Sequence, residues 1–161
     1  DLLQRYGGHA MAAGFSLDRS NLDAFRERLL AVARDRLAGV ELVPSLPIDA
    51  VCPLADASWE TLRALDALRP FGQAHPVPIC VSRDAQVRDA RVVGQRHLRL
   101  AVSDGRVTWE AIAFQQAAAL QDLPPRVDLA YNLDVNRWNG EARLQLIVRD
   151  LRPAGATIRE A

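Results

Sequence analysis

The residues best suited to chemistry lie at both ends of the sequence, and the first of them are Gly7, Gly8 and His9. Paired glycines can expose backbone N–H groups to a phosphate, and a histidine beside them can donate a further hydrogen bond. A tight turn with an incidental histidine accounts for the same three residues. The pattern alone leaves both interpretations open.

A second group of residues could hold a single strand of nucleic acid. In barrels that bind single strands, bases stack on aromatic rings and phosphates run past arginine side chains. The alternation of polar and apolar residues predicts that Tyr131 lies in the core, and it does not decide whether Trp109 points inward or outward. Trp138 lies in a predicted turn and is expected to be exposed. The candidate binding residues are Arg91, Arg99, Trp109, Tyr131, Asn136, Arg137, Trp138 and Arg143.

No complete catalytic site can be assembled from the sequence. His75 and His97 have no partners at metal-ligand spacing, and the carboxylates are scattered. Cys52 and Cys80 form no Cys-x-x-Cys pair, so they are expected to be small buried side chains in a reducing cytoplasm. The sequence therefore predicts a binding function without catalytic or metal-ligating residues of its own.

The composition is that of a soluble globular protein, with 161 residues, 49% hydrophobic and 25% charged. No apolar run approaches the roughly 20 residues that span a bilayer, and no secretory signal is visible, so we expect a cytoplasmic protein without a membrane partner. The net charge is zero, which counts against strong nucleic-acid binding. All twenty basic residues are arginine. Because the first residue is Asp1 rather than Met, we expect a longer parent protein.

Helical periodicity dominates the first part of the chain. Residues 21–37 predict a helix with one apolar stripe, a capping box at Ser20 and Asp23, and a stop at Gly39. A short strand is expected at 48–51. Residues 58–68 predict a second helix, whose inward side chains are expected to be Trp59, Leu62 and Leu65.

From residue 77 onward, apolar residues recur at every second position, which is typical of strands. Asp104-Gly105 and Asn139-Gly140 predict hairpin turns, and residues 115–120 predict a short helix. This pattern favours a five-stranded OB-fold barrel over a five-stranded sandwich. The helix falls one strand late for an OB-fold unless the first run is a lead-in strand. The predicted strands are 77–81, 87–93, 97–102, 107–114, 127–138 and 142–151.

Three segments together resemble the RecJ family of exonucleases. Residues 7–15 are similar to the signature of its DHH-associated domain. Residues 68–78 are similar to the Pro-Phe-Gly junction that leads into its OB domain, with His75 in place of the usual Asn. Residues 131–140, followed by Leu144, Gln145, Leu146 and Asp150, are similar to its closing Tyr-x-x-x-x-Asn-x-Trp-x-Gly hairpin.

The resemblance implies an α+β fragment followed by an all-β OB barrel with one short helix. The implied boundaries are the end of a DHH-associated domain at 1–45, a linker at 46–76, the OB domain at 77–153 and a tail at 154–161. Gly7, Gly8 and His9 would contact substrate phosphate. The barrel would bind and guide single-stranded DNA.

The resemblance also implies a parent enzyme that digests single-stranded DNA from its 5′ end in DNA repair and recombination. Its Mn²⁺ or Mg²⁺ would be ligated in a DHH domain, and because no Asp-His-His occurs here, we expect this chain alone to be inactive. The implied partners are single-stranded DNA, the parent's own DHH domain and a single-strand-binding protein.

Two other functions fit the same residues. The barrel could be a protein-docking module without DNA contact, and the dependence of binding on salt would separate that function from phosphate binding. A different DHH-associated family, acting on small nucleotides or on alanyl-tRNA, is disfavoured because it would not need a strand-guiding barrel.

Overall fold

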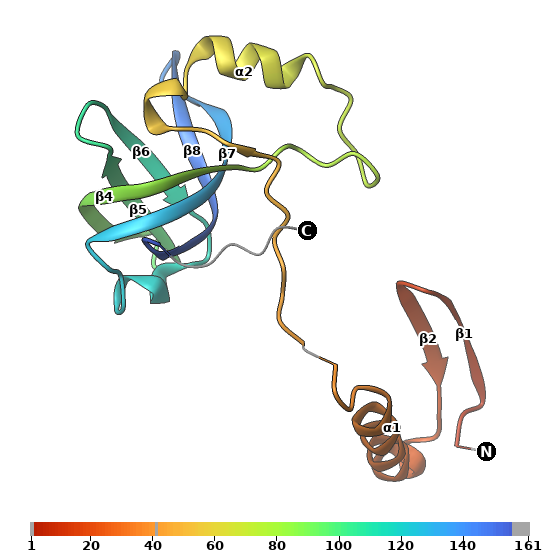
Figure 1. Ribbon diagram of the computed structural model, residues 1–161. Coiled ribbons are helices and arrows are strands. Elements are labelled where there is room, and N and C mark those ends of the chain that lie inside the picture. Colours follow the sequence, from red (N-terminus) through yellow and green to blue (C-terminus); the bar gives the residue numbers. More distant parts are fainter. Residues whose placement is uncertain (1, 41, 156–161) are drawn as a thin grey trace. The chain divides into compact units, whose positions relative to one another are not determined.

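The computed structural model describes residues 2–40 and 42–155, except for the side chain of Trp138. The chain folds as two compact units, Asp1–Pro44 and Ser45–Ala161. Figure 1 shows a hairpin and one long helix in the first unit and a barrel in the second. No helix among the described residues is long and apolar enough to cross a membrane.

The first unit is a hairpin followed by a helix. β1 (Arg5–His9) pairs antiparallel with β2 (Ala12–Ser16), and α1 spans Leu22–Arg36 after the short 3₁₀ helix η1 (Arg19–Asn21). The predicted helix is thus confirmed. The predicted capping box is wrong, because Asn21 occupies the N-cap position and makes no side-chain hydrogen bond there.

The described residues of the first unit form no buried core. The rings of Phe15 and Phe25 lie 4.6 Å apart between their centroids, which joins the hairpin to the helix. Tyr6, Leu29 and Val32 nevertheless remain at least half exposed. Exposed apolar surface of this kind is typical of interaction sites.

The second unit opens with β3 (Ala50–Val51), η2 (Leu54–Asp56) and α2 (Trp59–Asp66). The hydroxyl of Ser58 caps α2 by accepting the Thr61 N–H at 3.1 Å. Leu62 and Leu65 pack against the barrel core as predicted. The prediction for Trp59 is wrong: it stays 44% exposed, because the core contacts the helix stripe only from the second turn onward.

The barrel follows the strand order β4-β5-β6-β8-β7 and closes through pairing of β7 with β4. The contact between β6 and β8 is parallel, and the other pairs in the barrel are antiparallel. This closed mixed barrel confirms the OB-fold and excludes the sandwich. The elements are β4 (Cys80–Val93), β5 (His97–Ser103), β6 (Thr108–Ala113), η3 (Ala117–Leu120), β7 (Arg126–Trp138) and β8 (Glu141–Pro153).

β4 replaces the first two predicted strands with one long strand. Its pairing with β7 shifts register between Ser82 and Ala85, where Asp84 adopts a positive φ of 55°. Such a bulge inserts extra residues and bends the strand, which interrupts the alternation seen in the sequence. Counting β4 as the first barrel strand places η3 between the third and fourth strands, as an OB-fold requires.

The core fills the barrel and extends under the segment that precedes it. Tyr131 has no exposed surface, and its hydroxyl lies 3.1 Å from the hydroxyl of Ser82, which donates to the Cys52 carbonyl at 2.6 Å. The indole N–H of Trp109 donates to the Leu54 carbonyl at 2.8 Å. These bonds attach residues 52–54 to the barrel, so part of the expected linker belongs to the same folded unit.

Candidate nucleic-acid interface

The Gly-Gly-His segment lies in strand β1 rather than in a turn. A Cβ atom on Gly8 would come within 2.5 Å of the Ala12 carbonyl oxygen, so packing against β2 alone requires a glycine there. A Cβ on Gly7 would meet nothing within 4 Å, and His9 is exposed. Packing therefore explains Gly8 and not Gly7, and the phosphate-binding role stays a prediction.

The structure places the predicted arginines of the barrel in two groups. Arg91 on β4 and Arg99 on β5 are direct cross-strand partners. The second group lies on the β7–β8 hairpin, where Asn136 pairs with Arg143 and Arg137 pairs with Ala142. Both groups lie close to turns that join neighbouring strands.

Two of the predicted aromatic residues are structural. A base cannot stack on Tyr131 because its side chain has no exposed surface. Trp109 is half-buried against the core, and its only hydrogen-bonding group is used by the Leu54 carbonyl. The backbone of Trp138 pairs with Glu141, while its side chain lies outside the described residues. Tyr131 and Trp109 are therefore removed from the candidate surface.

Sequence reasoning missed Phe114, an exposed aromatic residue that directly follows β6. Phe114 is 52% exposed, and its ring packs edge-on against His97 with 5.2 Å between centroids. His97 is fixed in turn because its Nδ1 atom accepts the Gln115 N–H at 3.0 Å. Since Ala113 is buried on β6, the alternation of side chains was a signal that Phe114 faces outward.

Phe114, His97, Arg99 and Arg91 together form what we call the β4–β6 face. Side chains two residues apart point to the same side of a strand, so His97 and Arg99 share one face of β5. Arg99 lies opposite Arg91 on β4 and Ile112 on β6, so this face continues onto both neighbouring strands. The hydrogen bond from Arg99 to Glu110 spans 2.5 Å and crosses this face. An exposed aromatic ring and two arginines on one face can stack a base and contact neighbouring phosphates.

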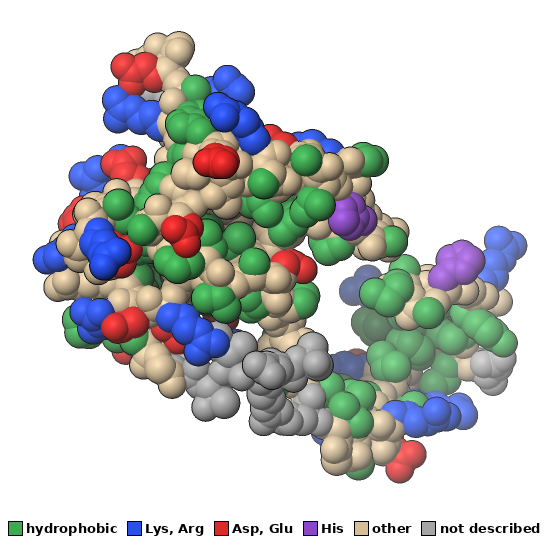
Figure 2. Space-filling view, turned by 45° about the horizontal axis from the view of Figure 1, so that its top comes forward, with side chains coloured by type: hydrophobic (Ala, Val, Ile, Leu, Met, Phe, Trp, Pro, Cys, Tyr) green, Lys and Arg blue, Asp and Glu red, His purple; other side chains and the backbone are tan. Residues whose placement is uncertain are grey.

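Several arginines of the barrel form ion pairs. Figure 2 shows acidic and basic side chains interspersed over it. Within the described part of the chain, Arg99, Arg126, Arg143 and Arg152 of the barrel each pair with a carboxylate, all at exposed positions. Exposed pairs of this kind contribute about 0–1 kcal/mol, so a phosphate can compete with the carboxylate for the guanidinium.

The described residues contain no group of three or more His, Cys, Asp or Glu side chains arranged to hold a metal ion. Cys52 and Cys80 are both buried free thiols. Burial raises the pKa of the Cys80 thiol to about 11, so this sulfur stays protonated near neutral pH. Neither cysteine is arranged as a ligand or a nucleophile.

The match to a known family covers most of the barrel unit. Residues 48–150 match the model of the RecJ OB domain. The chain belongs to the RecJ OB domain family. The single-stranded-DNA-specific exonuclease RecJ of Salmonella typhimurium is 34% identical over 95% of this chain, and that of Bacillus subtilis is 27% identical over 93%. The chain spans 27% and 20% of the lengths of these two relatives.

A crystal structure of RecJ from Thermus thermophilus in complex with Mg²⁺ matches the fold over 96% of this chain, with a TM-score of 0.76 and 31% identity. The match covers 24% of that RecJ chain, and a second structure of the same protein contains Mn²⁺. In OB-folds generally, the face of strands two and three and the turns beside it bind oligonucleotides. In this RecJ OB domain, those strands are β5 and β6, which carry most of the β4–β6 face.

Proposed function

We propose that this chain is the C-terminal part of a 5′-to-3′ single-stranded-DNA exonuclease that acts in DNA repair and recombination. Its OB barrel binds the single strand and guides it toward a metal-dependent active site elsewhere in the protein. The exposed ring of Phe114 next to His97, on the same face as the two arginines and at the strands that OB-folds use for oligonucleotides, carries the proposal.

Binding on this face follows from the chemistry of its side chains. A base stacks on Phe114 and gains on the order of 1–3 kcal/mol. Arg91 contacts a phosphate directly, and Arg99 exchanges Glu110 for a phosphate oxygen. None of these contacts reads a particular base, so the barrel holds single strands of any sequence.

Catalysis belongs to residues outside this chain in our proposal. The metal of the parent enzyme is Mn²⁺ or Mg²⁺, which in two-metal sites activates the attacking water and stabilises the leaving oxygen. This is supported by the Mg²⁺ and Mn²⁺ named with the Thermus thermophilus structures. Gly7, Gly8 and His9 contact substrate phosphate, and the chain alone does not cleave DNA.

The test is fluorescence anisotropy of a labelled single-stranded oligonucleotide, titrated with this chain at low and moderate salt. Single-strand binding that weakens with salt is expected, with duplex bound more weakly. Phe114→Ala should weaken binding roughly five- to a hundredfold, as expected for the loss of one stacked base. Arg91→Gln should weaken binding and reduce its salt dependence.

Trp59→Ala is the matched control, because Trp59 is 44% exposed but belongs to α2 and not to the β4–β6 face. Equal losses for Trp59→Ala and Phe114→Ala would contradict the assignment of the face. If the oligonucleotide binds at neither salt concentration, the barrel is a protein-docking module instead. The zero net charge and the exposed ion pairs favour that second function.

A further inference from the structure

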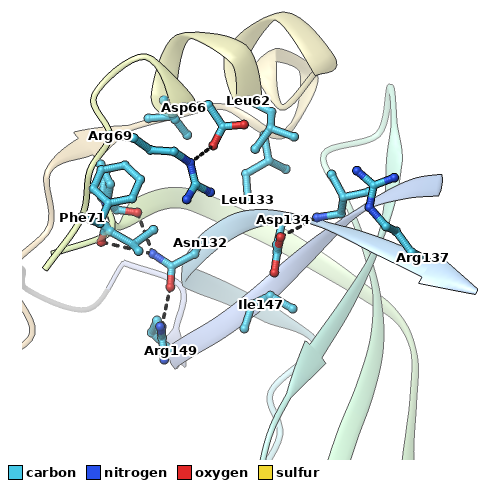
Figure 3. Close-up of a pocket in the computed structure, with 14 residues that line it drawn as sticks. Leu62, Asp66, Arg69, Phe71, Asn132, Leu133, Asp134, Arg137, Ile147 and Arg149 are labelled. Atoms are coloured by element: carbon cyan, nitrogen blue, oxygen red, sulfur yellow. Dashed lines mark hydrogen bonds and ion pairs between the residues drawn. The ribbon is translucent and has the colours of Figure 1, made fainter.

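A pocket with a volume of about 340 Å³ lies between α2, the segment that follows it, and strands β7 and β8. It lies within the barrel unit and contains none of the β4–β6 face residues. Figure 3 shows Arg69, Phe71, Asn132 and Arg149 at one end and Asp134 at the other. Its volume is in the range of small-ligand sites.

The first end holds two arginines, each bound through its Nε atom. The Nε atom of Arg69 donates to Asp66 at 2.8 Å, and its guanidinium lies 5.3 Å from the centroid of the Phe71 ring. The Nε atom of Arg149 donates to the Asn132 side-chain oxygen, and Asn132 in turn donates to the Pro78 carbonyl at 2.6 Å.

A guanidinium that is bound through Nε keeps its two Nη groups available for a further partner. Within the described residues, neither Arg69 nor Arg149 uses an Nη group in a hydrogen bond. An arginine that is already oriented by its Nε contact loses less conformational entropy when it binds an anion, and this applies most to Arg149, which is bound to the part-buried Asn132. This end of the pocket is therefore suited to a phosphate group, which takes several charge-assisted hydrogen bonds.

The middle and the far end have a different chemistry. Leu62 from α2, Leu133 from β7 and Ile147 from β8 provide an apolar wall. At the far end, one carboxylate oxygen of Asp134 accepts the Val135 N–H at 2.7 Å. The carboxylate repels anions and accepts hydrogen bonds from N–H groups. Arg137 also lines this far end, beside Asp134 (Figure 3). The pocket thus has two arginines at one end, an apolar wall in the middle, and a carboxylate beside a third arginine at the other end.

We propose that this pocket binds one nucleotide of a single strand. Its phosphate lies at Arg69 and Arg149, its sugar and base pack along the wall, and an exocyclic amino group of the base donates to Asp134. An inorganic anion would leave the wall unused. The inference rests on the proposed function for the source of the nucleotide, and binding of a mononucleotide tests it separately.

The experiment titrates this chain, labelled with ¹⁵N, with deoxycytidine 5′-monophosphate and follows the backbone amides and the arginine Nε–H signals by NMR. We expect shifts at Arg69, Arg149 and residues 132–135. Inorganic phosphate should shift the arginine signals alone. Deoxythymidine 5′-monophosphate should bind more weakly than the cytidine nucleotide, because thymine lacks the amino group, and Asp134→Asn should remove this preference.

Arg69→Gln and Arg149→Gln should each weaken the nucleotide about tenfold or more, as expected for loss of charge-assisted hydrogen bonds. Arg63→Gln is the control, because Arg63 is an exposed arginine of α2 that does not line the pocket. Dispersed spectra establish that each variant is folded, and Arg69 is already exposed, so its loss leaves the core intact.

Shifts confined to the β4–β6 face, or equal losses for Arg63→Gln and Arg69→Gln, would overturn the pocket assignment. Tighter binding of an aspartate-rich peptide than of either nucleotide would also overturn it. The proposed function fails by a different result, namely the absence of oligonucleotide binding that depends on Phe114. The two proposals can therefore fail independently.

Discussion

At the scale of single residues, Tyr131 has a structural role that its hydroxyl makes testable. Its ring is fully buried and its hydroxyl contacts Ser82. Tyr131→Phe keeps the ring and removes one hydrogen-bonding group, so we expect a loss of about 1 kcal/mol in the free energy of unfolding. Urea denaturation measures this loss. Oligonucleotide affinity should be unchanged, and a large loss of affinity in a folded variant would place Tyr131 back on the binding surface.

Cys80 gives a second residue-scale prediction, which concerns pH. Burial raises the pKa of its thiol from an ordinary value near 9 to about 11. The folded state therefore holds this proton more tightly than the unfolded state does. The contribution of this protonated thiol to the free energy of unfolding is complete below pH 9 and is lost as the pH rises through 11; it is on the order of 3 kcal/mol.

Urea denaturation across this pH range should show the chain losing stability more steeply than a Cys80→Ala variant. The comparison removes the effects of the other titrating groups, since both proteins share them. Parallel pH profiles for the two proteins would show that folding does not raise the pKa of the Cys80 thiol.

Among individual side chains, the sequence predicted burial better than exposure. Parity along β7 placed Tyr131 in the core, and the structure confirms this. The same alternation of side chains along β6 would have predicted that Phe114 points to the outside of the barrel and Trp109 to the inside. The hydrogen bonds of the Trp109 and Gln116 side chains to carbonyls far away in the sequence, however, depend on tertiary packing that no local pattern contains.

At the scale of elements, the two α-helices differ in how they begin. Ser58 caps α2 through the Thr61 N–H, whereas Asn21 at the start of α1 makes no side-chain hydrogen bond to the helix. Ser58→Ala should therefore cost about 1 kcal/mol of the free energy of unfolding, because a helix N–H loses its partner. Asn21→Ala is the matched control and should change little. Chemical denaturation followed by circular dichroism compares them.

Strand β4 shows where periodicity stops predicting elements. The hairpin turns were predicted correctly because Asp104-Gly105 and Asn139-Gly140 are local signals, and both glycines have positive φ. β4 was divided in two because the bulge near Asp84 breaks the alternation, while the strand continues through its pairing with β7. That pairing joins residues far apart in the sequence, such as Cys80 and Tyr131, so it cannot be deduced from a local window.

At the scale of the whole molecule, the two units differ in how much apolar surface they bury. The barrel unit contains all the buried hydrophobic residues identified in the described part of the chain, from Cys52 to Val148. In the first unit, Tyr6, Met11 and Leu22 are all more than half exposed. The chain spans 20% and 24% of the lengths of two RecJ relatives, and exposed apolar surface of this kind is typical of places where other protein segments pack.

Hydrogen exchange should therefore separate the two units. Amides of β5, β7 and β8 should exchange only through global unfolding, because their strands enclose the core. Amides of α1 should exchange with opening free energies near zero, because an isolated helix of this length without a packed face is marginal in water. A truncated chain that starts at Ser45 should keep the protection of the barrel and its unfolding midpoint in urea. If α1 is instead protected as strongly as β7, the first unit has a stabilising partner within this chain, and the exposed apolar residues would need a different explanation.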